Sequence, residues 1–477
     1  MCIYLNLMIF IKIIRGFLRT LLAARKQTKD FMPIQDMATG LFKSTLDGAN
    51  NTLTERIKQN ERRHQLRLSE REELDILGLA KRQSGQFEQF TPFSRVVAEP
   101  WLSSLSPEQL NTLQSDYQPF VKAGLATTVK GNEDRYQAFP YDGEYLFASR
   151  IDQEKGLDKD SKKALLDCLS TIGKESGSPM TYGVLLKADG DRMGELLSKA
   201  NQTKDSIAIS KALHQFATEV RCVVRKQGGH AIYTGGDDIL AFVPLNTSLV
   251  CAKMLAELFA NKMSAVNAEL NLVVETPPTL SVGLAIGHFV QPMRQLRQRA
   301  IQAEKLAKGN GLANPRNALA IQLGIRSGYE ISWRCRWDDK PTLDALQAFV
   351  AGFRKGLLPT RIMQEVLAMS QALKWTNCKD VESEVGVGIR LSEMERMLAR
   401  ASFAHSYSKE QLEQTDEEDE PSEGNSKRTF KDQLASLKQQ LREQAQAQSL
   451  DELANMLRIA RWLAAKTVAD LGKEEIS

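Results

Sequence analysis

One short segment, residues 231–243, constrains the fold of this chain more than any other. Apolar runs stand on both sides of the tetrapeptide Gly235-Gly236-Asp237-Asp238. Apolar runs joined by a glycine-rich turn are typical of a β-hairpin, so the segment predicts a hairpin that carries Asp237 and Asp238 at its tip. Adjacent carboxylates repel each other, and folded proteins tolerate them mainly where water screens them or a cation lies between them. A solvated turn and a cation site both stay open on this pattern alone.

A second acidic turn lies upstream. Residues 180–188 form a short β-type run that leads into Asp189-Gly190-Asp191, and a helical pattern opens with Glu195. The strand therefore delivers two aspartates into a glycine-containing turn before a helix. Such a turn presents free backbone N–H groups and the positive end of a helix dipole, which suits phosphate. An aspartate that simply caps the helix would account for one of the two residues but not for both.

The elements around these turns predict an α+β fold. In chain order, the hydrophobic pattern indicates a strand at 180–188, a helical stretch at 192–227, strands at 229–234 and 238–244, a helix at 248–270 and a strand at 279–286. This β-α-β-β-α-β order is that of a ferredoxin-like fold. With the strands ordered 4-1-3-2, the first and third are neighbours, which brings Asp189 and Asp191 to Asp237 and Asp238. Three or four carboxylates at one point predict a divalent-metal site, for Mg²⁺ or Mn²⁺, with phosphate oxygens completing the shell.

The chain divides into four predicted parts. They are an N-terminal helical and basic segment at 1–64, a mainly helical region at 65–178, the α/β domain at 179–340 and a helical domain at 341–477. Two further strands, at 316–322 and 329–333, are expected to extend the sheet. The acidic stretch 413–427 contains Pro and Gly, so it is predicted to be a disordered loop and not a metal site.

The first 22 residues are mostly apolar, but Lys12 and Arg15 interrupt them. A secretory signal carries its positive charge before the apolar run, and a membrane-spanning helix needs about 20 apolar residues without interruption. Neither description fits, so no membrane role is expected. The segment instead predicts an amphipathic helix that packs on a missing part of the protein, or sequence created where a gene was cut.

Charge and cysteine content exclude several classes of function. The 63 basic and 59 acidic residues nearly balance, at a net charge of +4, so charge alone does not indicate nucleic-acid binding. The six cysteines include no Cys-x-x-Cys pair, which argues against a zinc ribbon and for reduced thiols in the cytoplasm. No Gly-x-x-x-x-Gly-Lys-Ser/Thr loop is present, which excludes a Walker-type ATPase.

The motifs together resemble one known family. The hairpin tip, the strand end at 187–194 and the run at 283–288 are similar to the second palm domain of the large subunit of type III CRISPR effector complexes, the Cas10 family. They are most like its type III-B branch. Residues 74–82 and 93–101 resemble the segment that precedes this palm. The resemblance continues to the C-terminus and is most specific over 180–325.

The resemblance implies an activity and a set of site residues. Palms of this family resemble nucleotide cyclase palms, and they convert ATP into cyclic oligoadenylates with Mg²⁺ when the complex has captured target RNA. By this likeness Asp189, Asp237 and Asp238 are the metal ligands and the catalytic residues, and Asp191 is a weaker metal candidate. The residues expected to bind the nucleotide are Gly190, Asp191, Arg192, Met193, Gly194, Gly235, Gly236 and Lys308.

Lys308 lies in an Ala-Lys-x-x-Gly motif that resembles one found in diguanylate cyclases. By this likeness its ammonium would reach a phosphate of the nucleotide. A lysine at the end of a helix also serves as a partner of the helix dipole, and this second role stays open for Lys308.

The chain also departs from the family. Complete large subunits of the type III-B branch begin with an HD nuclease domain, a first palm and a zinc element. Here the five histidines form no His-Asp pair, and no first palm is recognisable. The chain therefore resembles the C-terminal half of a split or truncated subunit. The partners this implies are other type III effector subunits, the crRNA and target RNA bound through the complex, and a separate chain that supplies the N-terminal half.

Two functions stay open on the sequence. The retained Asp237 and Asp238 favour an active cyclic oligoadenylate synthase. The missing first palm favours a catalytically idle scaffold subunit, because members of the family bind ATP between two palms. A diguanylate cyclase fits less well, since the hairpin continues Asp-Asp-Ile and not Asp-Glu-Phe.

Overall fold

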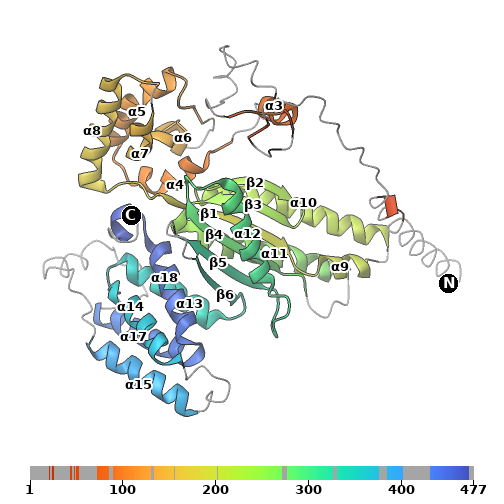
Figure 1. The fold of residues 1–477 in the computed structure, drawn as a ribbon. Helices are drawn as coiled ribbons and strands as arrows, with labels where there is room; N and C mark the ends of the chain where they lie inside the picture. The colour runs from red at the N-terminus through yellow and green to blue at the C-terminus, as the bar shows by residue number, and fades with distance from the viewer. Residues whose placement is uncertain are drawn as a thin grey trace, which may run out of the picture.

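The computed structural model of the chain places most residues from Glu72 onward (Figure 1). The described residues are 21, 24–25, 43–45, 48, 50–52, 72–84, 90–129, 134–154, 156–200, 202–270, 277–325, 330–374, 384–400 and 430–471. The acidic stretch 413–427 lies outside them, as does the apolar segment 1–22 apart from Leu21. What the sequence predicts for these two segments stays a prediction.

A six-stranded sheet forms the centre of the molecule (Figure 1). Its strands are β1 (Tyr182–Gly190), β2 (His230–Gly235), β3 (Asp238–Val243), β4 (Leu280–His288), β5 (Ala318–Gly324) and β6 (Glu330–Arg336). Their spatial order is β2-β3-β1-β4-β5-β6. The first four strands pair antiparallel in the predicted order, β5 runs parallel to β4, and β6 runs antiparallel to β5. The predicted ferredoxin-like α+β fold is confirmed, with two strands added at one edge.

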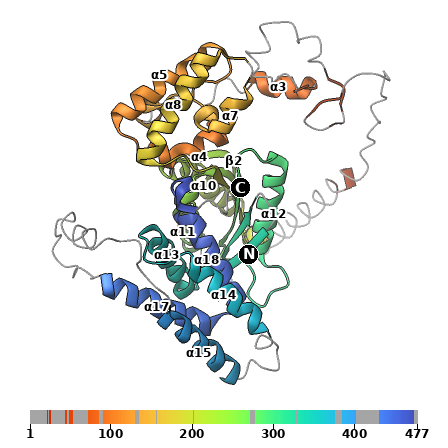
Figure 2. The same ribbon diagram turned by 60° about the vertical axis from the view of Figure 1, so that its left-hand side comes forward.

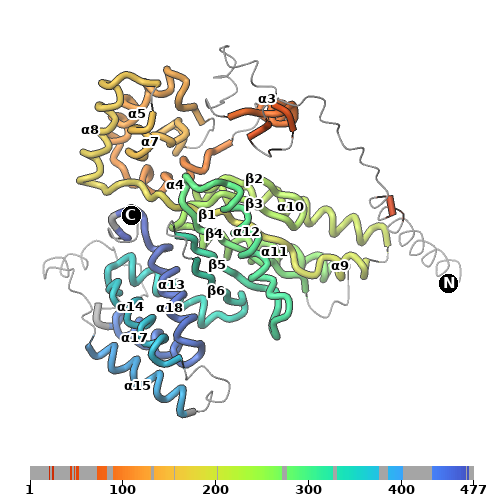
Figure 3. Tube along the Cα trace, viewed as in Figure 1, coloured from red at the N-terminus to blue at the C-terminus, as the bar shows by residue number. Residues whose placement is uncertain are grey.

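Helices cover both faces of this sheet, because successive side chains of a strand point to opposite sides. The helices α4 (Phe93–Leu102), α10 (Thr203–Lys226), α11 (Ser248–Leu270) and α12 (Met293–Lys308) pack on the sheet, and the short helix α9 (Met193–Lys199) follows β1. Val184 and Leu186 of β1 share one hydrophobic core with α10 and α11, which lie side by side (Figure 3). Leu185, between them in sequence, belongs to a second core with α4 and α12.

Three of the helices that precede the sheet build this second core, α5 (Pro107–Lys122), α7 (Ala148–Gln153) and α8 (Lys159–Ser176), together with a short 3-10 turn η2 (Glu144–Leu146). Two further helices, α3 (Ile76–Ser84) and α6 (Asp134–Ala138), also precede the sheet. Aromatic rings fill the centre of the second core, where Tyr117 stacks on Tyr141 with ring centroids 5.2 Å apart. Nε1 of Trp101 donates a hydrogen bond of 2.7 Å to the carbonyl of Gly177, which fixes the end of α8 just before β1.

The C-terminal helices continue the first core. They are α13 (Lys340–Arg354), α14 (Arg361–Ala372), α15 (Glu384–Arg400), α17 (Phe430–Ala447) and α18 (Leu450–Ala464), with short 3-10 turns η3 (Leu245–Thr247) and η6 (Val468–Leu471) nearby. Trp462 of α18 packs edge-on against Tyr182 at the start of β1, with ring centroids 4.6 Å apart. In Figure 2, α5 and α8 lie at the top, α15 and α17 at the bottom, and the sheet between them.

The predicted helical stretch 192–227 is wrong in one respect, because it is two helices. The chain leaves the helical conformation at Ala200, where φ is −69° and ψ is 92°. A new helix, α10, then begins with a capping box in which the Asp205 carboxylate accepts a hydrogen bond of 2.9 Å from the backbone N–H of Gln202. This local hydrogen bond competes with a continuous helix and restarts it.

The predicted strand at 316–322 begins two residues later than expected. Arg316 and Asn317 have φ values of 67° and 47°, in the left-handed region that no strand residue occupies. The backbone N–H of Asn317 donates a hydrogen bond of 3.0 Å to the carboxylate of Asp191, which accounts for this conformation. The extended backbone of β5 therefore starts only at Ala318.

Replacing Trp462 by Ala tests how far the C-terminal helices support the sheet. Trp462 is 2% exposed and packs on Tyr182, so its truncation leaves a cavity between α18 and β1. We expect the free energy of unfolding to fall by about 3–5 kcal/mol, measured by urea denaturation followed by circular dichroism. The control Val250→Ala, at a residue 49% exposed on α11, should change this free energy by less than about 0.5 kcal/mol. Equal stability of the two variants would show that the Trp462 contact does not support the sheet.

Candidate functional site

The hairpin between β2 and β3 forms as predicted. Gly235 and Asp238 are the last paired residues, so Gly236 and Asp237 make a two-residue turn. Gly236 has a φ of 67°, which L-residues with a side chain rarely adopt and which hairpin turns of this length require. The two-residue turn places Asp237 at the tip and Asp238 at the start of β3.

The sheet register brings the second acidic turn to this tip. Ala188 of β1 pairs with Ile239 of β3, and one further step in the antiparallel register sets Asp189 opposite Asp238. Gly190 then lies against Asp237, since a Cβ atom at Gly190 would be 2.7 Å from the Cβ of Asp237. Only glycine permits this approach. The structure therefore brings together Asp189, Asp237 and Asp238, which the sequence places about 50 residues apart.

Two lysines neutralise two of these carboxylates. Nζ of Lys187 lies 3.0 Å from Oδ1 of Asp238. The ammonium of Lys308, at the end of α12, forms an ion pair with Asp189 and a second one, of 2.9 Å, with Glu304. Burial lowers the pKa of Lys308, but its hydrogen bonds to Asp189 and Glu304 outweigh this effect and raise the pKa above its ordinary value. The cation that the sequence predicts at a phosphate thus lies beside a carboxylate in this structure.

Asp237 is the carboxylate with the least favourable surroundings of the three. Its burial raises the pKa of its side chain above the ordinary value, and the negative charges of Asp189 and Asp238 raise it further. A hydrogen bond from the backbone N–H of Asp237 and, less strongly, the nearby ammonium of Lys308 oppose this shift only in part. Repulsion among like charges is what a bound cation relieves. The tip of the hairpin therefore has the electrostatics of a cation site.

Asp191 does not join the other three carboxylates, contrary to the expectation that all four meet. Its side chain is 2% exposed and accepts hydrogen bonds from the hydroxyls of Thr279 and Ser281, at 2.8 and 2.9 Å, and from the N–H of Asn317. The chain turns away after Gly190, so Asp191 faces the beginnings of β4 and β5. It links three strands of the sheet, and its contact with a nucleotide stays a prediction.

The remaining predicted nucleotide-binding residues follow β1. Arg192 has a φ of 59° and caps α9, and Met193 is buried beneath the turn. A Cβ atom at Gly194 would meet nothing within 4 Å, so this glycine stands in open space. Tyr233 folds back over Gly235, where a Cβ atom would lie 2.1 Å from the tyrosine hydroxyl. The roles of these residues toward a triphosphate stay predictions.

Lys187 is the site residue that sequence reasoning missed. A signal for it was present, because side chains two residues apart on a strand share a face, and Lys187 stands two residues before Asp189. A charged residue within an otherwise apolar strand, on the face of a predicted carboxylate site, is a candidate for that site. Its pairing with Asp238 depends on the register of β3, which the sequence shows only indirectly.

The carboxylates fit a divalent cation by their chemistry. Mg²⁺ and Mn²⁺ prefer carboxylate oxygens, and Asp189, Asp237 and Asp238 supply them from two adjacent strands. Within the part of the chain that the structure describes, however, no three His, Cys, Asp or Glu side chains gather closely enough to hold a metal ion. Lysine ammoniums stand beside Asp189 and Asp238 instead. Metal binding at this site is a proposal that rests on the donor set and on the repulsion at Asp237.

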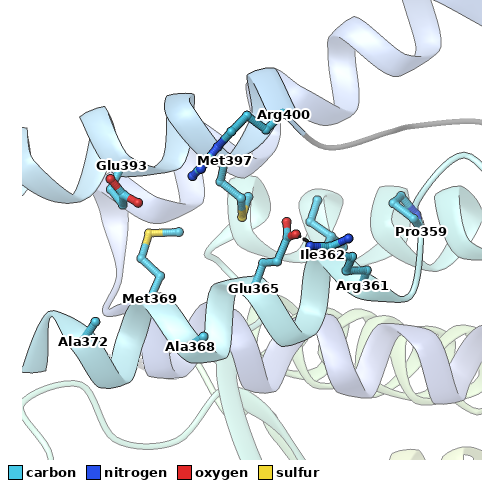
Figure 4. Close-up of a pocket in the computed structure, with 10 residues that line it drawn as sticks. All are labelled: Pro359, Arg361, Ile362, Glu365, Ala368, Met369, Ala372, Glu393, Met397 and Arg400. Carbon is cyan, nitrogen blue, oxygen red and sulfur yellow. Dashed lines mark ion pairs between the residues drawn. The ribbon is translucent and has the colours of Figure 1, made fainter.

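A groove of about 490 Å³ lies between α14 and α15, where Met369 and Met397 point toward each other (Figure 4). It is lined by Pro359, Arg361, Ile362, Glu365, Ala368, Met369, Ala372, Glu393, Met397 and Arg400. None of the predicted site residues lines it. Among the described helices, none combines the length and the apolar character that crossing a lipid bilayer requires.

Comparison with known families decides what this sheet is. Residues 182–320 match the second palm domain of Cas10/Cmr2. This match makes residues 182–320 a palm of the Cas10/Cmr2 type. The matched range runs from β1 into β5 and contains every residue predicted for the site.

Known relatives show how much of such proteins the chain represents. The CRISPR system Cmr subunit Cmr2 of Pyrococcus furiosus is 30% identical over 213 residues, which cover 39% of this chain and 23% of that relative. The match therefore spans less than a quarter of the relative. The apo state of a type III-B Cmr-beta complex superposes with a TM-score of 0.44 and 12% identity, over 70% of this chain and 45% of that one. A Csm1–Csm4 cassette in complex with cA4 gives a TM-score of 0.30 and 14% identity, over 60% and 37% of the two chains.

The unfavourable position of Asp237 predicts that its neutral isostere stabilises the protein. Without divalent cations at pH 7, Asp237→Asn should raise the melting temperature and should raise the free energy of unfolding by no more than about 1 kcal/mol, because it removes a repelled charge that water already screens in part. The folded-state pKa of Asp237 is raised, so its charge destabilises the protein above that pKa. The gap between wild type and variant should therefore shrink as the pH falls through the folded pKa, and vanish below the unfolded pKa of about 3.9.

Asp338 provides a control of opposite sign for this measurement. The hydrogen bond from Arg336 lowers the pKa of Asp338 below its ordinary value, so its charge stabilises the folded state. Differential scanning fluorimetry should show a lower melting temperature for Asp338→Asn at pH 7. A melting temperature of Asp237→Asn equal to or below that of wild type would contradict the electrostatics described for the hairpin tip.

Proposed function

We propose that this palm binds ATP and Mg²⁺ and synthesises cyclic oligoadenylates within a type III CRISPR complex that targets RNA. The observation that carries the proposal is the opposition of Asp189 and Asp238 across β1 and β3, with Asp237 pressed against Gly190. This cluster lies inside the range that matches the Cas10/Cmr2 second palm. Phosphoryl transfer demands little covalent chemistry from a protein and depends on positioning and on charge neutralisation.

The proposed roles follow from where each side chain lies. Asp189, Asp237 and Asp238 would hold Mg²⁺ or Mn²⁺, which when bound neutralises phosphate charge and favours ionisation of the attacking 3′-hydroxyl. Lys308 reaches the same tip from α12 and would contact a phosphate. In the reaction, the 3′ oxygen of one nucleotide bonds to the α-phosphorus of the next, and pyrophosphate leaves. Gly236 leaves room at the tip, because a Cβ atom there would meet nothing within 4 Å.

The assembly is part of the same proposal. The relative from Pyrococcus furiosus is named as a subunit of a Cmr system, and the match spans 23% of its length. We propose that other type III effector subunits bind this chain, that crRNA and target RNA are bound through the complex, and that another chain supplies the remaining palm.

An idle scaffold is the second candidate, and one observation favours it. Lys187 and Lys308 already neutralise Asp238 and Asp189, so the described structure keeps two of the three carboxylates satisfied without a metal. A palm in this condition would keep its fold and its contacts with partner subunits without turning over ATP. Measurement of product separates the two candidates.

The assembled complex should form cyclic oligoadenylates from ATP and Mg²⁺ when cognate RNA is added, as detected by mass spectrometry. The double variant Asp237→Ala/Asp238→Ala should reduce the product at least 100-fold, because it removes two of the three proposed metal ligands. Asp338→Ala, which removes an exposed carboxylate outside the site, should leave the yield within about twofold. Equal product from wild type and double variant would refute the assigned roles, and a complete complex without product would establish the scaffold.

A further inference from the structure

We propose that Lys187 is a second phosphate-binding lysine of the palm, held by Asp238 until a nucleotide triphosphate arrives. This inference rests on the proposed function and deepens it. It assigns a role to a residue of β1 that the Ala-Lys-x-x-Gly motif and the acidic turns do not include. The observation behind it is the ion pair between Lys187 and Asp238, with 3.0 Å between Nζ and Oδ1.

The position of Lys187 follows from the alternation of β1. Gly183, Leu185, Lys187 and Asp189 share one face of the strand. The first two are covered, since a Cβ atom at Gly183 would lie 2.5 Å from Val97 of α4, and Leu185 is 1% exposed. Lys187 is the first position on this face beyond the cover of α4, with 21% of its side chain exposed. Its ammonium is therefore partly exposed to solvent next to the hairpin tip.

The ion pair with Asp238 adds too little stability to the fold to explain a lysine at position 187. An ion pair between partly exposed side chains contributes about 0–1 kcal/mol, and ordering a lysine side chain costs up to about 2 kcal/mol of rotamer freedom. Asp238 is 44% exposed, so water already solvates it in part. An apolar residue that extended the cover of α4 would suit the fold at least as well. A role in ligand binding therefore explains Lys187 better than a role in stabilising β1 does.

The charge balance at the tip identifies the kind of ligand. Four carboxylates, those of Asp189, Asp237, Asp238 and Glu304, face two ammoniums, those of Lys187 and Lys308. One divalent cation would offset the excess of two negative charges, and a triphosphate would then add its own negative charge. With Asp238 shared with such a cation, the three N–H donors of Lys187 would be available to phosphate oxygens.

The two lysines approach the carboxylates from different elements. Lys308 comes from the end of α12 and contacts Asp189, and Lys187 comes from β1 and contacts Asp238. Because Asp189 and Asp238 oppose each other across neighbouring strands, the two ammoniums flank the same pair of carboxylates. A triphosphate lying over this pair would receive one lysine on each side. A lysine in this position can contact a bound triphosphate, whereas a lysine elsewhere on the surface would only screen charge.

Lys187→Met in the assembled complex tests the proposal by two binding measurements of opposite sign. Binding of Mn²⁺ alone, followed by electron paramagnetic resonance of the free ion, should tighten about 2–5-fold because the competing ammonium is gone. Binding of α,β-methylene-ATP in the presence of Mn²⁺, measured by calorimetry, should weaken about tenfold because a phosphate contact is lost. Lys187→Arg keeps the positive charge and should bind the nucleotide within about threefold of wild type.

Lys305→Met is the matched control, because it removes the same charge from an exposed position on α12 three residues before Lys308. It should change neither affinity by more than about twofold. Thermal unfolding of each variant verifies that the palm remains folded. A weaker affinity of Lys187→Met for both Mn²⁺ and nucleotide would overturn the proposal, since it would indicate that the lysine only supports the fold.

The outcomes separate this inference from the proposed function. If wild type binds Mn²⁺ and nucleotide, Asp237→Asn/Asp238→Asn does not, and Lys187→Met binds nucleotide as wild type does, the role of Lys187 is wrong and the site stands. If wild type binds neither probe, the proposed function and the inference both fail. Opposite shifts in the two affinities, with recovery in Lys187→Arg, support the inference.

Discussion

The interaction on which the rest of this palm depends is the repulsion at the hairpin tip, where the charges of Asp189 and Asp238 both act on Asp237 and raise its pKa. Lys308 pairs with Asp189 and Lys187 pairs with Asp238, while Asp237 stays against Gly190. Repulsion among like charges is what a bound cation relieves. A carboxylate cluster that already gathers ammoniums from β1 and α12 is a natural place for a metal ion and for phosphate.

The register of β1 keeps this cluster at the surface. Val184, Leu186 and Ala188 point into one core, and Leu185 into the other, so a slip of one residue would exchange every side chain between the faces and carry Asp189 into the first core. Helices distant in sequence hold that register: α4 and α12 on one face, α10, α11 and α18 on the other. The precision of the site therefore depends on packing around the whole sheet.

The two aspartates of the second acidic turn have different roles, one in the charge of the site and one in its structural support. Asp189 faces the hairpin and its neighbouring carboxylates, whereas Asp191 is buried under hydrogen bonds from Thr279, Ser281 and Asn317. Those bonds join the end of β1 to the starts of β4 and β5. This support also bears on Lys308. Asn317 lies in the loop between Lys308 and β5, so its hydrogen bond to Asp191 restrains the segment that follows this lysine.

The sequence by itself determined the hairpin and the succession of strands and helices, because turn chemistry and the alternation of apolar residues are local properties. The order of the strands in the sheet, and with it the meeting of Asp189 with Asp237 and Asp238, followed only when that succession was assigned to a ferredoxin-like fold. Only the tertiary structure decided the partners of Asp191 and Lys187. Asp191 bonds to residues 88 to 126 positions away, and Lys187 to one 51 positions away. Such pairings arise from the register and packing of distant strands, and these carry no pattern within any short stretch of sequence.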